Sequence, residues 1–183
     1  VIRFIVNTIN PDLSKSPKIL DPACGTGGFM IESIQHMSSK VKSNKDRTKL
    51  FEKTVFGIEK KSMPFLLGMM NCLLHDIDEP HIANRNTLGY PFSDITDENQ
   101  YDVIVTNPPF GGEEESELKS NLPTGMQTTD TALAFLLYIM YSLKKNGKCG
   151  IILPDTPLLP TEGITARIKQ KLLEEFNLHT IIR

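Results

Sequence analysis

The stretch KILDPACGTGGF, residues 18–29, places a glycine-rich turn between a short apolar run and a longer apolar-periodic segment. Residues 18–20 predict the opening of a buried strand that runs into Asp21, and residues 29–41 predict a helix. Glycine lets the backbone adopt positive φ and approach a ligand without a Cβ in the way. The start of the helix presents free N–H groups, which suit a carboxylate or a phosphate. The stretch predicts a strand–turn–helix unit that holds a ligand, with a tight turn that holds none as the alternative.

Three classes of nucleotide-type ligand use glycine-rich turns of this kind. A phosphate-binding P-loop needs G-x-x-x-x-G-K-[ST], and the stretch contains no Gly-Lys-Ser/Thr. A dinucleotide fingerprint needs G-x-G-x-x-G, but counting from Gly25 and Gly27 puts Met30 in the third place. S-adenosylmethionine is the third class: Asp21 would face its cationic amino group, and the glycines would make room for it. The turn therefore favours S-adenosylmethionine.

Strand-like and helix-like segments alternate along the rest of the chain. Helices are expected at residues 1–9, 63–75, 130–143 and 162–175, and strands at residues 54–58, 81–85, 101–106, 150–153 and 178–182. Such alternation predicts an α/β fold with a mainly parallel, open sheet flanked by helices. Ligands of such sheets bind at the carboxyl ends of the strands.

Four segments carry expectations of their own. The apolar residues of 63–75 run nearly all round the helix, which predicts that this helix is well buried. Residues 41–53 are polar and lysine-rich, which predicts a solvated excursion. Residues 111–129 lack periodicity, which is typical of a functional lid or a disordered segment. Asp130 is expected to cap a helix that ends at residues 144–147, with Gly147 just beyond the last turn.

Two polar residues follow the second and third expected strands. Glu59 is placed to accept hydrogen bonds from both hydroxyls of a ribose, as carboxylates do in other α/β cofactor sites. A solvated charge pair with the neighbouring Lys60 is the alternative. Asn86 is placed to hydrogen-bond the adenine edge of a cofactor, with a plain turn asparagine as the alternative.

The tetrapeptide Asn107-Pro108-Pro109-Phe110 follows the clearest strand. Two prolines fix φ and remove two N–H donors, which leaves the carbonyls of Asn107 and Pro108 as rigid acceptors beside the Asn107 side-chain oxygen. Phe110 offers a flat apolar face. Together these groups suit a planar conjugated amine, because the oxygens can take its two N–H bonds while the ring stacks on it. A proline-rigid turn with Phe110 in the core is the alternative.

Composition bounds the possible functions. The 183 residues suit about one domain, and a net charge of −2 argues against an autonomous, strongly basic nucleic-acid module. The chain has three cysteines, far apart in the sequence, which exclude a disulfide framework and indicate a reducing compartment, the cytoplasm. Its four histidines have no metal-ligand spacing, so no metal site is expected. No apolar run reaches 18 residues, so no membrane span is expected.

Two motifs of the chain together resemble those of a known family. DPACGTGGF at 21–29 followed by NPPFG at 107–111 looks like the amino-methylating DNA methyltransferases. More narrowly, the chain resembles the methylation (modification) subunit of type I restriction–modification systems. The stretches that carry this narrower resemblance are residues 57–60, 70–75, 86–88, 143–147 and 151–154.

The resemblance implies a Rossmann-like, S-adenosylmethionine-dependent methyltransferase fold that methylates adenine N6 in DNA, with the base flipped out of the duplex. The residues that it implies as cofactor contacts are Asp21, Pro22, Ala23, Cys24, Gly25, Thr26, Gly27, Gly28 and Glu59. It implies that Asn107, Pro108, Pro109 and Phe110 clamp the target base. Relatives often have Asp where Asn86 stands, at the expected adenine contact.

The resemblance also implies partners. A separate specificity subunit recognises the DNA sequence, which fits the near-neutral charge, and an ATP-dependent restriction subunit joins for cleavage. Residues 1–183 would be the catalytic domain, an internal fragment of a subunit that also has an N-terminal helical region and a further C-terminal part. Two rivals remain open: a methyltransferase that acts on a protein glutamine or an rRNA base amine, and a non-catalytic cofactor-binding assembly module.

Overall fold

The computed structural model describes residues 1–41, 43, 46, 50, 53–111, 116–155 and 162–183. Its elements are α1 Ile2–Ile9, β1 Ile19–Asp21, α2 Gly28–Ser38, β2 Val55–Glu59, α4 Ser62–Leu73, β3 His81–Asn84, β4 Tyr101–Thr106, α5 Thr131–Ser142, β5 Leu143–Ile151 and α6 Gly163–Glu175. Short 3₁₀ turns lie at Leu13–Lys15, Phe92–Asp94, Asp97–Asn99 and Ser116–Asn121.

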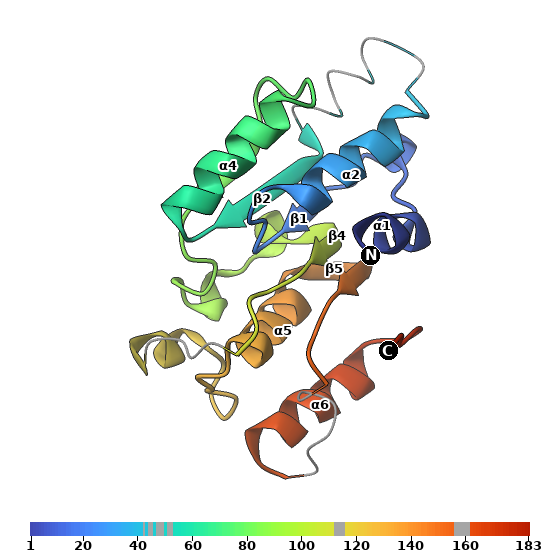
Figure 1. Ribbon diagram of the computed structural model, residues 1–183. Coiled ribbons are helices and arrows are strands. Elements are labelled where there is room, and N and C mark those ends of the chain that lie inside the picture. Colours follow the sequence, from blue (N-terminus) through green and yellow to red (C-terminus); the bar gives the residue numbers. More distant parts are fainter. Residues whose placement is uncertain (42, 44–45, 47–49, 51–52, 112–115, 156–161) are drawn as a thin grey trace.

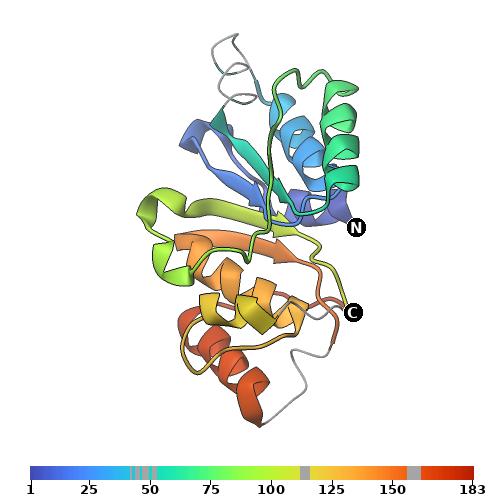
Figure 2. The ribbon, with the colours of Figure 1, turned by 90° about the vertical axis from the view of Figure 1, so that its left-hand side faces the viewer.

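Within the described residues the strands form one parallel sheet in the order β3-β2-β1-β4-β5. The chain moves outward from β1 to β2 and β3, and then returns to the other side of β1 for β4 and β5. Right-handed crossovers therefore place α2 and α4 on one face of the sheet and α5 on the other. Figures 1 and 2 show this arrangement, with α1 beside α2 and α6 packed on α5. The predicted open parallel sheet is confirmed.

Each face of the sheet carries its own apolar core. On the α1 and α2 side, Ile19 and Val103 pack with Met30, whereas on the α5 side Leu20 and Ile104 pack with the helix. Successive side chains of a strand point to opposite faces, so a strand with helices on both sides is apolar throughout. This explains why the run at 103–105 is the clearest strand in the sequence.

Local sequence signals set the ends of several helices. Asp130 caps α5 as expected, because its side chain accepts a hydrogen bond from the Leu133 N–H at 2.9 Å. α1 ends at Asn10, which takes a left-handed conformation just before Pro11. No helix in the described ranges combines the length and the apolar character needed to cross a bilayer.

The prediction that the helix at 63–75 is well buried is wrong. In α4 only Gly68 and Cys72 are buried. Large side chains on its outer face are exposed: Met63, Leu66, Leu67, Met70 and Leu73, followed by Leu74. The helix covers β2 and β3 near the edge of the sheet, so only one side of it meets other elements (Figure 1). An apolar sequence does not specify how many neighbours a helix has.

Two further expectations at the C-terminal half need correction. Residues 178–182 form no strand; Leu178, Ile181 and Ile182 are exposed beyond α6. Strand-like residues need a neighbouring strand with free hydrogen-bonding groups, and the sequence pattern cannot supply one. The end of α5 also differs from the expectation. The chain enters β5 directly at Leu143, and the residue with positive φ is Asn146 rather than Gly147.

The two polar segments lie partly outside the described residues. Of 111–129, residues 112–115 are not described, but Ser116–Asn121 forms a 3₁₀ turn and Leu122 is buried in the core. The expectation of a disordered segment is therefore wrong for its second half, while a functional lid stays a prediction. Most of 41–53 also lies outside the described residues, although Leu50 is fully buried, against the expectation of a solvated excursion.

Candidate active site

The candidate site lies at the carboxyl edge of the sheet, where the strand order reverses. β1 and β4 are neighbours there, with Leu20 paired to Ile104, but their connecting helices lie on opposite faces. Ligands of open α/β sheets bind at such switch points, because the two crossovers leave a crevice between them. Asp21 ends β1, Glu59 ends β2, and Asn107 directly follows β4. Three predicted site residues, far apart in the sequence, therefore share one edge.

Asp21 is almost completely buried, with 2% of its surface exposed. Burial, together with the negative charge of Glu59, raises the pKa of its carboxyl to about 7. The Ala23 N–H, which donates to Asp21 Oδ1 at 3.2 Å, and the Thr106 hydroxyl oppose that rise. Near neutral pH this carboxyl can take up or release a proton, and a cation bound beside it would favour the charged form.

The glycine turn exposes its backbone on one side. Gly25 and Gly27 have φ of 53° and 81°, which glycine adopts without steric cost. A Cβ at Gly25 would meet nothing within 4 Å, so open space borders the backbone there. The N-cap of α2, Gly27, has no side-chain cap, which leaves the first helical N–H groups without that partner. The turn can therefore accept a ligand against its main chain.

Glu59 holds the turn in place. Its Oε2 accepts from the Gly25 N–H at 3.0 Å, and its Oε1 accepts from the Lys61 N–H at 2.7 Å. Neither the predicted ribose contact nor the alternative charge pair with Lys60 included this structural role. A carboxylate has about four acceptor positions, so two backbone contacts leave capacity for ligand hydroxyls.

α4 supports the turn from the other side through Gly68 and Asn71. Neither residue was predicted from the sequence to belong to the site. A Cβ on Gly68 would lie 2.9 Å from the Gly25 carbonyl oxygen, so only glycine allows this approach. The Asn71 amide donates to the Thr26 carbonyl at 2.9 Å. The sequence did contain a signal for the contact made by Gly68, because a glycine inside an apolar helix often marks a close approach of another backbone.

Asn86 serves as a turn residue. Its Oδ1 accepts from the Leu88 N–H at 3.1 Å, and its carbonyl accepts from the Gly89 N–H at 3.2 Å. The next residue, Thr87, is buried and donates from its hydroxyl to the Pro22 carbonyl. The loop after β3 is thereby tied to the glycine turn, while the contact of Asn86 with a cofactor stays a prediction.

The tetrapeptide after β4 presents its ends to the surface. Asn107 and Pro109 are exposed, Pro108 is buried, and Phe110 is 50% exposed. Phe110 is therefore not a core residue, against the alternative that placed it there, and the role of the tetrapeptide as a base clamp stays a prediction. The Asn107 side chain and the Phe110 ring are accessible to a ligand from outside.

Cys24 lies inside the turn, in surroundings that disfavour the thiolate form. Burial raises the pKa of its thiol, and the charges of Asp21 and Glu59 add to the effect. A nucleophilic cysteine needs the opposite shift, because the thiolate is the reactive form. Cys24 instead fills space beside the turn.

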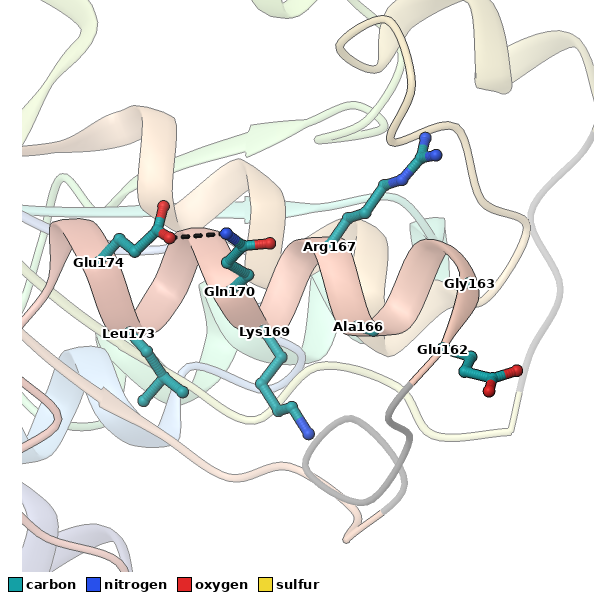
Figure 3. A pocket seen from close by; sticks show the side chains of 8 residues that line it. All are labelled: Glu162, Gly163, Ala166, Arg167, Lys169, Gln170, Leu173 and Glu174. Carbon is teal, nitrogen blue, oxygen red and sulfur yellow. Dashed lines mark hydrogen bonds between the residues drawn. The ribbon is translucent and has the colours of Figure 1, made fainter.

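A hollow of about 590 Å³ lies elsewhere, on the outer side of α6 (Figure 3). It is lined by Glu162, Gly163, Ala166, Arg167, Lys169, Gln170, Leu173 and Glu174. Apart from Glu162, which directly precedes the helix, these residues belong to α6, and Gln170 donates to Glu174 at 2.6 Å. None of the predicted site residues lines it, so the carboxyl edge remains the candidate site.

Comparison with known proteins gives matches along the whole chain. Residues 1–183 match the N-6 DNA Methylase family. The methylase subunit of the type I restriction enzyme EcoEI from Escherichia coli is 45% identical over 184 residues, which cover 100% of this chain and 36% of that protein. The chain thus spans about a third of the length of this relative.

Solved structures agree with this match. A type I restriction enzyme modification subunit from Vibrio vulnificus YJ016 is 45% identical and superposes with a TM-score of 0.89, over 97% of this chain and 38% of that one. A class I S-adenosylmethionine-dependent methyltransferase from Listeria monocytogenes, 14% identical, has a TM-score of 0.66 and covers 94% of this chain and 49% of its own. The second likeness concerns the fold alone, and it confirms the predicted Rossmann-like methyltransferase fold.

Proposed function

This chain belongs to the N-6 DNA methylase family, and on that basis we propose that it is the catalytic domain of a type I DNA methyltransferase subunit. The reaction is transfer of a methyl group from S-adenosylmethionine to adenine N6 in DNA. One observation carries the proposal: the acidic glycine turn after β1 and the Asn-Pro-Pro-Phe tetrapeptide after β4 lie on adjacent strands at one edge of the sheet. Ligands of open α/β sheets bind at this edge, so the two motifs would hold a methyl donor and its acceptor next to each other.

The residues of the turn suit the proposed cofactor. S-adenosylmethionine supplies an electrophilic methyl group on a sulfonium, and its methionine part carries an ammonium. Ionised Asp21 would hold that ammonium, because a buried carboxylate without a bound cation is costly. The open space beside Gly25 gives room for the ligand, and the remaining acceptor positions of Glu59 would take ribose hydroxyls. The other proposed contacts are Pro22, Ala23, Cys24, Thr26, Gly27, Gly28 and Asn86.

The tetrapeptide suits the proposed acceptor. The amino nitrogen of adenine is a poor nucleophile, because its lone pair is delocalised into the ring. The Asn107 side-chain oxygen and the Pro108 carbonyl would accept its two N–H bonds and raise its electron density, while Pro109 keeps the carbonyls fixed. Phe110, half exposed, would stack on the base once it leaves the duplex. The amino proton becomes acidic only after N–C bond formation begins, so no separate general base is required.

The remaining parts of the proposal concern the whole protein. Residues 1–183 would be one catalytic domain of a longer subunit, since they cover 36% of the EcoEI relative. A net charge of −2 makes strong autonomous DNA binding unfavourable, so a DNA-specificity subunit would supply recognition and an ATP-dependent restriction subunit would join for cleavage. With DNA as substrate and three free cysteines, we place the protein in the cytoplasm.

The test uses the intact subunit with its specificity subunit, labelled S-adenosylmethionine and unmethylated DNA that is afterwards digested to nucleosides. Label is expected in N6-methyldeoxyadenosine, with at least a hundredfold loss of rate in Asn107→Ala and near-normal cofactor binding. Asn99→Ala, an exposed asparagine in the 3₁₀ turn Asp97–Asn99, is the matched control and should behave as wild type. Label in protein or RNA alone would favour the glutamine or rRNA alternatives. Binding without any transfer would favour an assembly module.

A further inference from the structure

Thr106, the last residue of β4, carries a buried hydroxyl at the proposed site. The side chain is fully buried, and its Oγ1 makes no hydrogen bond within the described part of the chain. Buried polar groups are nearly always hydrogen-bonded, so an orphan hydroxyl in a native protein needs an explanation. This one lies between the two halves of the proposed site, directly before Asn107.

The surroundings of Thr106 point to Asp21 as the missing partner. β4 lies beside β1, with Leu20 paired to Ile104, so the ends of the two strands are adjacent. The Thr106 hydroxyl is close enough to favour the ionised form of Asp21. An uncharged carboxyl is a weak acceptor, whereas a carboxylate is a strong one that accepts at both oxygens. The hydroxyl can turn about its Cβ–Oγ1 bond, so it can donate as soon as Asp21 is ionised.

The other groups around Asp21 do not help it to ionise. Glu59 faces it from β2 with a negative charge, and the Cys24 thiol faces it from the turn. Cys72, from α4, lies beside Cys24 and is neutral as well. Among the described residues no cation acts on Asp21. The Ala23 N–H and the Thr106 hydroxyl are therefore the groups that favour the carboxylate.

We propose that Thr106 is a positioning residue of the cofactor site, whose hydroxyl donates to the Asp21 carboxylate and stabilises the charge that receives the cofactor ammonium. This inference rests on the proposed function and assigns a role to a residue outside both motifs. The Thr106 hydroxyl stabilises Asp21 only in its ionised form. It therefore improves cofactor binding only at pH values at which Asp21 would be protonated without it. Its effect on affinity therefore depends on pH, which a merely structural role does not require.

The experiment compares Thr106→Val, which keeps the branched shape but removes the hydroxyl, with Thr106→Ser, which keeps the hydroxyl. Thr106→Val should fold, because replacing an unpartnered buried hydroxyl by a methyl group costs little. Ser142→Ala is the matched control, since Ser142 is also fully buried and its Oγ also lacks a partner among the described residues, but it ends α5. Two quantities are measured in the full chain: the titration of the Asp21 carboxyl by carbon-13 NMR without ligand, and the affinity for S-adenosylmethionine from pH 6 to pH 9.

Thr106→Val is expected to raise the pKa of Asp21 by about one unit, and to weaken cofactor binding about tenfold at pH 6 with no difference at pH 9. Thr106→Ser and Ser142→Ala should both follow the wild type. An unchanged Asp21 titration in Thr106→Val, or an equal loss of affinity at every pH, would overturn the role of Thr106. Failure of the wild type to bind S-adenosylmethionine at any pH would instead overturn the proposed function, and the titration would still decide whether Thr106 acts on Asp21.

Discussion

The Oε2 atom of Glu59 accepts a hydrogen bond from the Gly25 N–H at 3.0 Å, which joins the end of β2 to the turn that follows β1. The second carboxylate oxygen accepts from the Lys61 N–H at 2.7 Å, at the start of α4. One side chain thus fixes two loops of the same edge. The turn is held at a defined distance from the sheet before any ligand arrives, which reduces the ordering that binding must impose.

Glu59→Gln tests this link. The amide keeps one acceptor but replaces the other with a donor, so one backbone N–H loses its partner. Because hydrogen bonds to charged groups contribute about 1.5–3 kcal/mol, the free energy of unfolding should fall by roughly 1–2 kcal/mol. The pKa of Asp21 should fall as well, because the Glu59 charge raises it. Denaturant unfolding and carboxyl NMR measure the two effects, with the exposed Glu98→Gln as control. An unchanged unfolding midpoint would show that the link is not needed.

Asp21 should make stability depend on pH. Its pKa is about 7 in the folded protein against 3.8 in the unfolded chain, so the folded state holds an extra proton between these values. The resulting stabilisation is fully present below about pH 4 and is lost as pH rises to about 7. The change is on the order of 4 kcal/mol over that window. Asp21→Asn cannot titrate, so the stability difference between wild type and variant should follow this curve in unfolding measurements from pH 4 to pH 8. A difference that is constant with pH would contradict it.

Gly68→Ala should destabilise the protein, although alanine is the better helix former. Inside a helix the exchange alone would gain about 1 kcal/mol. A Cβ at 2.9 Å from the Gly25 carbonyl oxygen must instead push α4 away from the turn, at a cost of roughly 1–3 kcal/mol. Thermal unfolding measures the stability, and calorimetric titration with S-adenosylmethionine should show weaker binding. Leu67→Ala, on the outer face of the same helix, is the control. A more stable Gly68→Ala protein would mean that the two elements are not in contact.

The outer face of α4 should tolerate charge in this chain. Leu67 and Met70 are 46% and 59% exposed, so Leu67→Glu and Met70→Glu remove little packing. Their unfolding free energies should stay within about 0.5 kcal/mol of wild type. Cys72→Asp, on the buried side of the same helix, should cost several kcal/mol, because it buries a charge without a partner. Chemical denaturation of the three variants measures this. A large loss in the first two would place the outer face inside a packed core.

Several elements follow from short-range signals that the sequence states directly. Tyr101–Thr106 is a strand with the predicted bounds, because a continuous β-branched run fits a sheet covered on both faces. The cap of α5 by Asp130 depends only on residues three positions apart. The strand predicted at residues 178–182 does not form. A strand must pair with a neighbouring strand that is distant in the sequence, and no local pattern encodes that pairing.

The alternation of strands and helices, and the two motifs at the ends of β1 and β4, can be read from the amino-acid sequence alone. These depend on periodicity, glycine and proline, whose effects act within a few residues. Three features depend on how the folded segments pack: the buried side of α4, the approach of Gly68 to Gly25, and the hydrogen bond from the turn to Glu59. The same packing raises the pKa of the Asp21 carboxyl and brings the Thr106 hydroxyl close to it. Burial and electrostatic environment are properties of the segments that pack around a residue, and those segments come from distant parts of the chain.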